Sequence, residues 1–104
     1  MLYLMLDIHN GTKLAKVGVT RRALRQRRSQ YKTHNPLAIM RSSCAGTEGQ
    51  EGRCQMVLFS KGTRIQGTEW AVVSDEVFAE LYEKGMGYFY PNHSPIHFHE
   101  RFAD

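Results

Sequence analysis

The amino-acid sequence predicts one small domain of the α/β (α+β) class, in which helices flank a three-stranded antiparallel sheet. The chain has 104 residues, 41% of them hydrophobic, which suits one domain with one modest core. Two short apolar stretches near the N-terminus are joined by a hairpin signal, and three later stretches open with residues that cap helices. The expected order of elements is therefore strand, strand, helix, strand, helix, helix.

The first two strands are predicted at Leu2–Leu6 and Leu14–Val19, which are apolar and partly β-branched. Between them stands Asn10-Gly11, a pair that tolerates the positive φ angles of a tight hairpin turn. The third strand is predicted at Leu37–Cys44. Together these segments would form the antiparallel sheet.

The first helix is expected to be strongly basic. Thr20 can cap a helix from about Arg21 to Thr33, which Asn35-Pro36 would close. The basic side chains of this segment are Arg21, Arg22, Arg25, Arg27, Arg28 and Lys32.

Two further helices are indicated by their first residues. Thr47 and Gln50 stand in capping-box spacing and open a helix that runs to about Phe59. Ser74, followed by two acidic residues, starts a helix that Gly85 ends. Residues 86–104 are expected to form an irregular tail packed on the domain of residues 1–85.

The net charge of +4 is unevenly spread along the chain. Residues 1–37 hold eight Lys or Arg against one Asp, a local charge of +7, whereas the remainder holds six basic and nine acidic residues, a local charge of −3. Such asymmetry in one small domain favours a face that attracts a polyanion, DNA or RNA. The alternative is a solvated helix balanced by acidic neighbours.

The cellular setting is expected to be the cytoplasm. Cys44 and Cys54 are the only cysteines, and the apolar start of the chain is too short for a secretion signal. No apolar run approaches the about 20 residues that span a bilayer, so no membrane partner is expected.

Two charged residues fall on the apolar sides of their predicted helices. Arg27 lies between Leu24 and Tyr31 at helical spacing. Glu51 lies on the side of the next helix that Cys54 marks as apolar. Either the arginine and the glutamate form a salt bridge, or they face a common site.

The order of short motifs resembles the GIY-YIG nuclease superfamily, closest to a small phage and bacterial branch with K-I-G and E-W-F motifs. Tyr3 stands where the first motif has its tyrosine, and Lys16-Val17-Gly18 stands where the second motif lies. The segment RRSQYKTHNP resembles the arginine-led helix of that branch, EGRCQMVLF its glutamate helix, and GTEW its E-W element.

The resemblance implies an endonuclease that hydrolyses phosphodiester bonds in DNA with one Mg²⁺ or Mn²⁺ ion. Glu51 would bind the metal, and Arg27 would contact the scissile phosphate. Tyr3 would orient the attacking water, with Lys16 supplying positive charge beside it. Tyr31 would orient the water or the phosphate. The remaining candidates would hold the nucleic acid, namely Arg21, Arg22, Arg25, Arg28, Lys32 and Asn35.

This sequence departs from the superfamily at two positions of the motifs. Lys16 replaces the second tyrosine, as in the K-I-G branch, and Ala71 replaces the aromatic residue that usually follows Glu-Trp. Arg27 is preferred over Arg25 as the phosphate ligand because the helix is then in register with its Thr-x-Asn-Pro end. The shared site also requires Arg27 and Glu51 to lie on the same side of the sheet.

Two other classes of function remain open. The chain could be a nucleic-acid-binding module without hydrolysis, or a phage-type accessory domain whose basic face meets an acidic protein. Its small surface predicts weak sequence preference, unless it forms a homodimer or is delivered by a partner protein. The tail histidines His93, His97 and His99 offer a zinc site only if the tail is regular.

Overall fold

An antiparallel sheet forms the centre of the computed structural model, which describes residues 1–34, 37–93 and 95–103, with the side chains of residues 31–34 left out. Within these residues the sheet has six strands in the order β4-β5-β2-β1-β3-β6. The three long strands are β1 (Leu2–His9), β2 (Thr12–Val19) and β3 (Ile39–Cys44). The short strands are β4 (Thr63–Arg64), β5 (Ala71–Val72) and β6 (His97–Phe98).

The expected three-stranded sheet is therefore wrong in number, although the α+β class holds. The three additional strands have two residues each. A two-residue strand cannot show the alternation of apolar and polar residues by which strands are recognised in a sequence. One of them, β6, lies in the tail that was expected to be irregular.

The hairpin between β1 and β2 follows the sequence signal. Asn10 and Gly11 have φ angles of 51° and 78°, as a tight two-residue turn requires. The register pairs Leu2 with Val19 and Tyr3 with Gly18. Because side chains alternate along a strand, this register sends Tyr3 and Lys16 to one face of the sheet and Val17 to the other.

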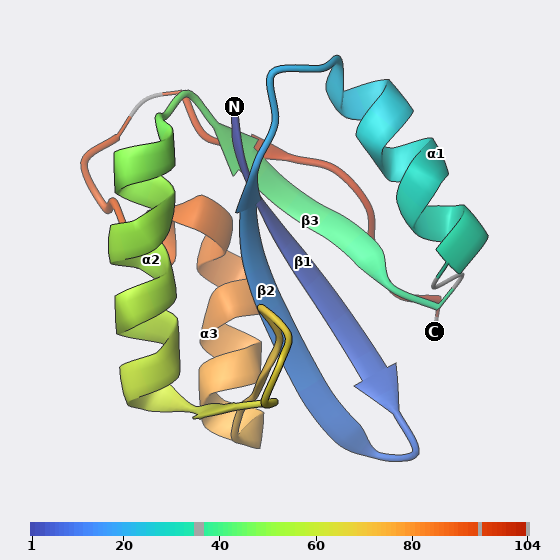
Figure 1. Cartoon of the computed structure of the whole chain (residues 1–104). Coiled ribbons are helices and arrows are strands. Elements are labelled where there is room, and N and C mark those ends of the chain that lie inside the picture. The colour runs from blue at the N-terminus through green and yellow to red at the C-terminus, as the bar shows by residue number, and fades with distance from the viewer. Residues whose placement is uncertain (35–36, 94, 104) are drawn as a thin grey trace.

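The two faces of the sheet carry separate apolar clusters. The larger cluster includes Leu4 and Val17 and is covered by the helices α2 (Glu48–Lys61) and α3 (Asp75–Lys84). The smaller one is formed by Tyr3, Met5, Ala38 and Met40, with Leu24 and Trp70 against it. Leu24 begins the helix α1 (Leu24–His34), which lies on the opposite side of the sheet from α2 and α3 (Figure 1).

The helix starts agree with the sequence for α2 and α3 but not for α1. Thr47 and Gln50 form the predicted capping box of α2, and the Ser74 side chain accepts from the Val77 N–H at 3.2 Å. At α1 the Thr20 hydroxyl accepts from the Arg22 N–H at 3.0 Å, which closes a turn before the helix instead of capping it. The helix therefore begins at Leu24, three residues later than expected.

The tail is attached to the sheet along β3. A short 3₁₀ helix, η1 (Gly85–Tyr88), follows α3, and β6 then pairs with β3. The buried Arg41 of β3 donates to the carbonyl of Tyr82 at 2.8 Å and to that of Glu100 at 3.1 Å. Among the described residues, no helix is long and apolar enough to cross a membrane.

Candidate functional site

The predicted tyrosine and arginine of the site are in direct contact. Tyr3 of β1 is buried, with 1% of its surface exposed, and its hydroxyl accepts from Arg27 Nε at 3.0 Å. The Arg27 guanidinium carbon lies 5.8 Å from the centre of the Tyr3 ring. A second bond, from Arg27 Nη1 to Gln30 Oε1 at 3.3 Å, fixes the guanidinium on the inner side of α1. Arg27 therefore turns toward the sheet, as its helical spacing predicted.

The Tyr3 hydroxyl lies directly over Gly18, the glycine of the Lys16-Val17-Gly18 motif. A Cβ atom added at Gly18 would lie 2.3 Å from the Tyr3 hydroxyl oxygen and 2.4 Å from its ring carbon Cζ. No side chain fits there without displacing the phenol. The glycine is thus required for the close approach of Tyr3 to β2.

The same part of β2 is reached from the other side by α2. β5 pairs with β2 at Leu14 and Ala15, and further along the strand α2 supplies polar side chains to the backbone. Gln55 Nε2 donates to the Val17 carbonyl at 3.4 Å, and the Val19 backbone lies close enough to the Glu51 carboxylate to lower its pKa. The Glu51 carboxylate and the Tyr3 hydroxyl are therefore both placed on the segment from Val17 to Val19.

Glu51 approaches the site from the edge of the sheet. α1 and α2 pack on opposite faces, so Arg27 and Glu51 do not share a face as the sequence analysis required. Glu51 nevertheless interacts electrostatically with Lys16, whose side chain is on the face of Tyr3. The expectation that Arg27 and Glu51 lie on the same side of the sheet is therefore wrong, and Lys16 links the two sides through its ion pair with Glu69 and its attraction to Glu51.

Burial and neighbouring charges together explain the shift of the Glu51 pKa. Burial raises the pKa of Glu51 most, followed by the negative charge of Glu69, while the Val19 N–H and Lys16 lower it. Lys16 itself forms an ion pair with Glu69, with Nζ 3.4 Å from Oε2. The raised pKa therefore reflects chiefly the burial of the Glu51 carboxylate, with the repulsion of Glu69 added to it.

Glu69 is a site residue that the sequence analysis did not assign. It belongs to the Gly67-Thr68-Glu69-Trp70 element, whose position in the motif order was recognised while no role was given to its carboxylate. Pairing with Lys16 and repulsion of Glu51 now place it at the site.

The site fits a hard divalent cation through carboxylate oxygens. Glu51, with Glu69 nearby, provides the one or two carboxylates with which Mg²⁺ is commonly held, the other ligands being water and substrate phosphate. A bound cation would stabilise the charged form of Glu51, which burial and the charge of Glu69 disfavour. Within the described part of the chain, no three His, Cys, Asp or Glu side chains converge as a metal cage would.

The predicted nucleic-acid ligands differ in their surroundings. Arg21 is 91% exposed and lies 3.6 Å from Glu48, a solvated contact of little strength. Arg28 pairs with Glu100 of the tail, with Nε 2.8 Å from Oε1, which gives it a structural partner. The side chains of Tyr31 and Lys32, and the whole of Asn35, lie outside the described residues.

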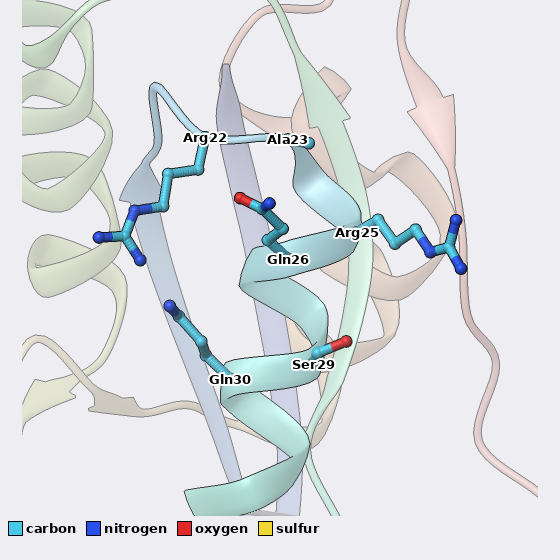
Figure 2. Close-up of a pocket in the computed structure, with 6 residues that line it drawn as sticks. All are labelled: Arg22, Ala23, Arg25, Gln26, Ser29 and Gln30. Carbon is cyan, nitrogen blue, oxygen red and sulfur yellow. The ribbon is translucent and has the colours of Figure 1, made fainter.

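Arg22 and Arg25 line a hollow on the side of α1 that is turned away from the sheet. The other residues of this hollow are Ala23, Gln26, Ser29 and Gln30. Figure 2 shows that the two arginine side chains extend in opposite directions, Arg22 from the segment just before α1 toward β2 and α2, and Arg25 from α1 toward the tail. The hollow therefore has a positive charge at each side.

The tail histidines have separate environments. His99 Nε2 lies 2.6 Å from the Ser43 hydroxyl, whereas His97 is exposed. The His93 ring is tilted against Tyr90, with ring centres 5.8 Å apart. His99 fastens the tail to β3 through this hydrogen bond.

No protein-family model, no curated protein and no solved structure matches the chain. The resemblance to GIY-YIG nucleases therefore rests on the order of the motifs in the sequence.

Proposed function

We propose that the protein is a metal-dependent endonuclease that hydrolyses phosphodiester bonds in DNA. The main support is the position of the Tyr3 hydroxyl, which bonds Arg27 and lies over Gly18, beside the backbone that holds Glu51. A guanidinium and a hydroxyl in contact, with a carboxylate of the helix on the other face of the sheet beside β2, are groups that phosphodiester hydrolysis uses.

Each side chain has a role that follows from its contacts. Arg27 would bind a non-bridging oxygen of the phosphate, since its fixed guanidinium can stabilise developing negative charge. The Tyr3 hydroxyl would orient a water oxygen that forms the new bond to phosphorus as the bond to the leaving sugar oxygen breaks. Lys16 would add positive charge beside the phosphate. Tyr31 keeps the orienting role that the resemblance implies.

Glu51, assisted by Glu69, would hold Mg²⁺ or Mn²⁺, which when bound neutralises the phosphate and stabilises the leaving oxygen. A carboxylate has several lone pairs, so Glu51 can bind a cation while it remains beside the Val19 backbone. The donor set is therefore suited to an ion that keeps most of its water.

Cleavage of supercoiled plasmid tests the proposal. A time course with Mg²⁺, with Mn²⁺ and with a chelator should show nicking that needs the metal and is lost in Glu51→Gln and Arg27→Ala. Glu83→Gln and Lys84→Ala, both on exposed positions of α3, are matched controls that should cut normally. Equal nicking by wild type and both site variants would refute the assignment of the site.

A binding module without hydrolysis is the second candidate. The near-complete burial of Tyr3 favours it, because a substrate phosphate must still reach the hydroxyl. Such a protein would bind DNA with a steep salt dependence, show no turnover with any metal, and keep its affinity in Glu51→Gln.

The remaining parts of the proposal concern location and assembly. Cys44 and Cys54 are both buried and unbridged, which suits a reducing cytoplasm. A phage-type accessory role, a homodimer and delivery by a partner protein would each be seen as co-purification or a change in oligomeric state.

A further inference from the structure

The outer side of α1 has a composition that differs from the rest of the basic segment. Leu24, Arg27 and Arg28 are engaged with the sheet or the tail. The side turned away carries two arginines with neutral hydrogen-bonding side chains between them: Arg22, Arg25, Gln26, Ser29 and Gln30. The helix has no acidic residue. Neutral amides would add little to a surface that binds only phosphates, because phosphate binding depends on positive charge.

Gln26 and Gln30 are four residues apart and so are neighbours on the helix surface. Gln30 accepts from Arg27 through its oxygen, which leaves its amide nitrogen as a donor. An amide side chain offers both a donor and an acceptor, the pattern with which Gln pairs with the adenine edge in the major groove. Gln26 therefore offers the paired donor and acceptor of an adenine contact, and Gln30 offers a donor for an acceptor on a base edge.

The arginines flank these amides on two sides. In Figure 2 Arg22 and Arg25 point away from each other, with Gln26 between them. A helix with its side chains is about 10–12 Å wide and fills a DNA major groove of about 12 Å, so a phosphate backbone lies along each side of it. A single strand would offer one such backbone. Duplex RNA has a major groove too deep and narrow for a helix.

We propose that α1 enters the major groove of duplex DNA, where Gln26 and Gln30 contact base edges while Arg22 and Arg25 contact the two flanking backbones. Since Arg27 lies on the same helix and bonds Gln30, the bases so contacted would be close to the phosphate at Tyr3. This placement of the cut rests on the proposed function, whereas the binding does not. On this proposal the protein has a clear sequence preference, in place of the weak preference expected from the small surface of the domain.

Selection of bound sequences from a pool of random duplex DNA, without divalent metal, tests the base contacts. Wild type should enrich a short motif and bind it about tenfold or more tightly than a scrambled duplex, the scale of one paired base contact. Gln26→Ala and Gln30→Ala should each reduce that ratio several-fold, and Gln26→Ala, which leaves the bond between Gln30 and Arg27 in place, should keep the affinity for the scrambled duplex nearly unchanged. Gln66→Ala, at an exposed glutamine outside α1, is the control and should behave as wild type.

Salt titrations with the same duplex test the two arginines. Arg22→Ala and Arg25→Ala should each lower the slope of log affinity against log salt by about 1, and Lys84→Ala should not. On single-stranded DNA at most one of the two arginine variants should lower the salt slope. Alanine is the stronger helix former, so the variants should fold, and circular dichroism would verify it.

Three results would overturn the inference: no enriched motif, the same motif enriched by the Gln26→Ala/Gln30→Ala double variant, or binding to an acidic protein but not to duplex DNA. If the protein nicks DNA but shows no sequence preference, this inference is refuted and the proposed nuclease function stands. If it binds selectively but does not nick DNA, the nuclease function is refuted and this inference stands.

Discussion

Replacing Gly18 by alanine should damage the fold and the site together. The new Cβ would lie 2.3 Å from the Tyr3 hydroxyl oxygen, where ordinary contacts begin at 3.4 Å. The phenol would therefore have to move by about 1 Å or more, although its ring is buried beside Met5 and Met40. It cannot move far without losing its bond with Arg27.

The size of the effect follows from two costs. Forcing extra volume into a packed site costs about 1–3 kcal/mol, and weakening a hydrogen bond to a charged donor adds to it. For a domain of this size each kcal/mol lowers the melting temperature by about 4–8 °C. Gly18→Ala should therefore unfold at a clearly lower temperature than wild type, by about 5–20 °C.

Thermal unfolding followed by circular dichroism is the assay, with Gly52→Ala as the matched control. An added Cβ at Gly52 meets no atom within 4 Å, and alanine in a helix interior stabilises by about 0.5–1 kcal/mol, so this variant should melt at or slightly above wild type. The plasmid assay would be run on both variants below their melting temperatures. A Gly18→Ala protein as stable as wild type would refute the close approach of Tyr3 to β2.

Three further outcomes are expected. Burial, together with the charges of Arg28 and His97, lowers the pKa of His99, with Glu100 opposing the shift. The unfolded chain then takes up a proton at higher pH than the folded one, so wild type should lose stability as the pH falls below about 6.5. His99→Gln should lack that loss in urea titrations at about pH 7.5 and about pH 5.5, and an unchanged pH dependence would exclude His99 as its source. The side chains of the Arg28–Glu100 pair are 36% and 15% exposed, so a double-mutant cycle of unfolding should give a coupling energy of about 1 kcal/mol. A coupling energy of zero would show that this pair does not hold α1 to the tail. Burial raises the pKa of the Cys44 and Cys54 thiols, so both should react with a disulfide reagent at mildly alkaline pH only after unfolding, and fast reaction of the native protein would contradict their burial.

The parts of the fold that the sequence predicted are those specified by local chemistry. Asn10-Gly11 determines its turn by tolerating positive φ, and the Thr47 capping box needs only residues three apart. The predicted start of α1 was wrong because the Thr20 hydroxyl accepts from the Arg22 N–H and closes a turn there, before the helix begins. A hydroxyl that can bond either one of two nearby N–H groups does not specify which it will take.

The site was harder to predict because it depends on contacts between distant segments. Helical spacing placed Arg27 toward the sheet, yet spacing alone could not say that α2 would cover the opposite face. Glu69 follows a two-residue strand and a turn, so no periodic pattern indicated the direction of its side chain. Its relation to Lys16 exists only once β5 has paired with β2.

The shortness of β5 has a consequence for the site. Its pairing with β2 is at Leu14 and Ala15, and a strand continuing along β2 would have bonded the outward backbone groups of Val17 and Val19. Instead, Gln55 of α2 donates to the Val17 carbonyl, and the Glu51 carboxylate lies close enough to the Val19 backbone for that backbone to lower the Glu51 pKa. Because β5 is short, side chains of α2 reach the edge of β2 next to Gly18, the glycine over which Tyr3 lies.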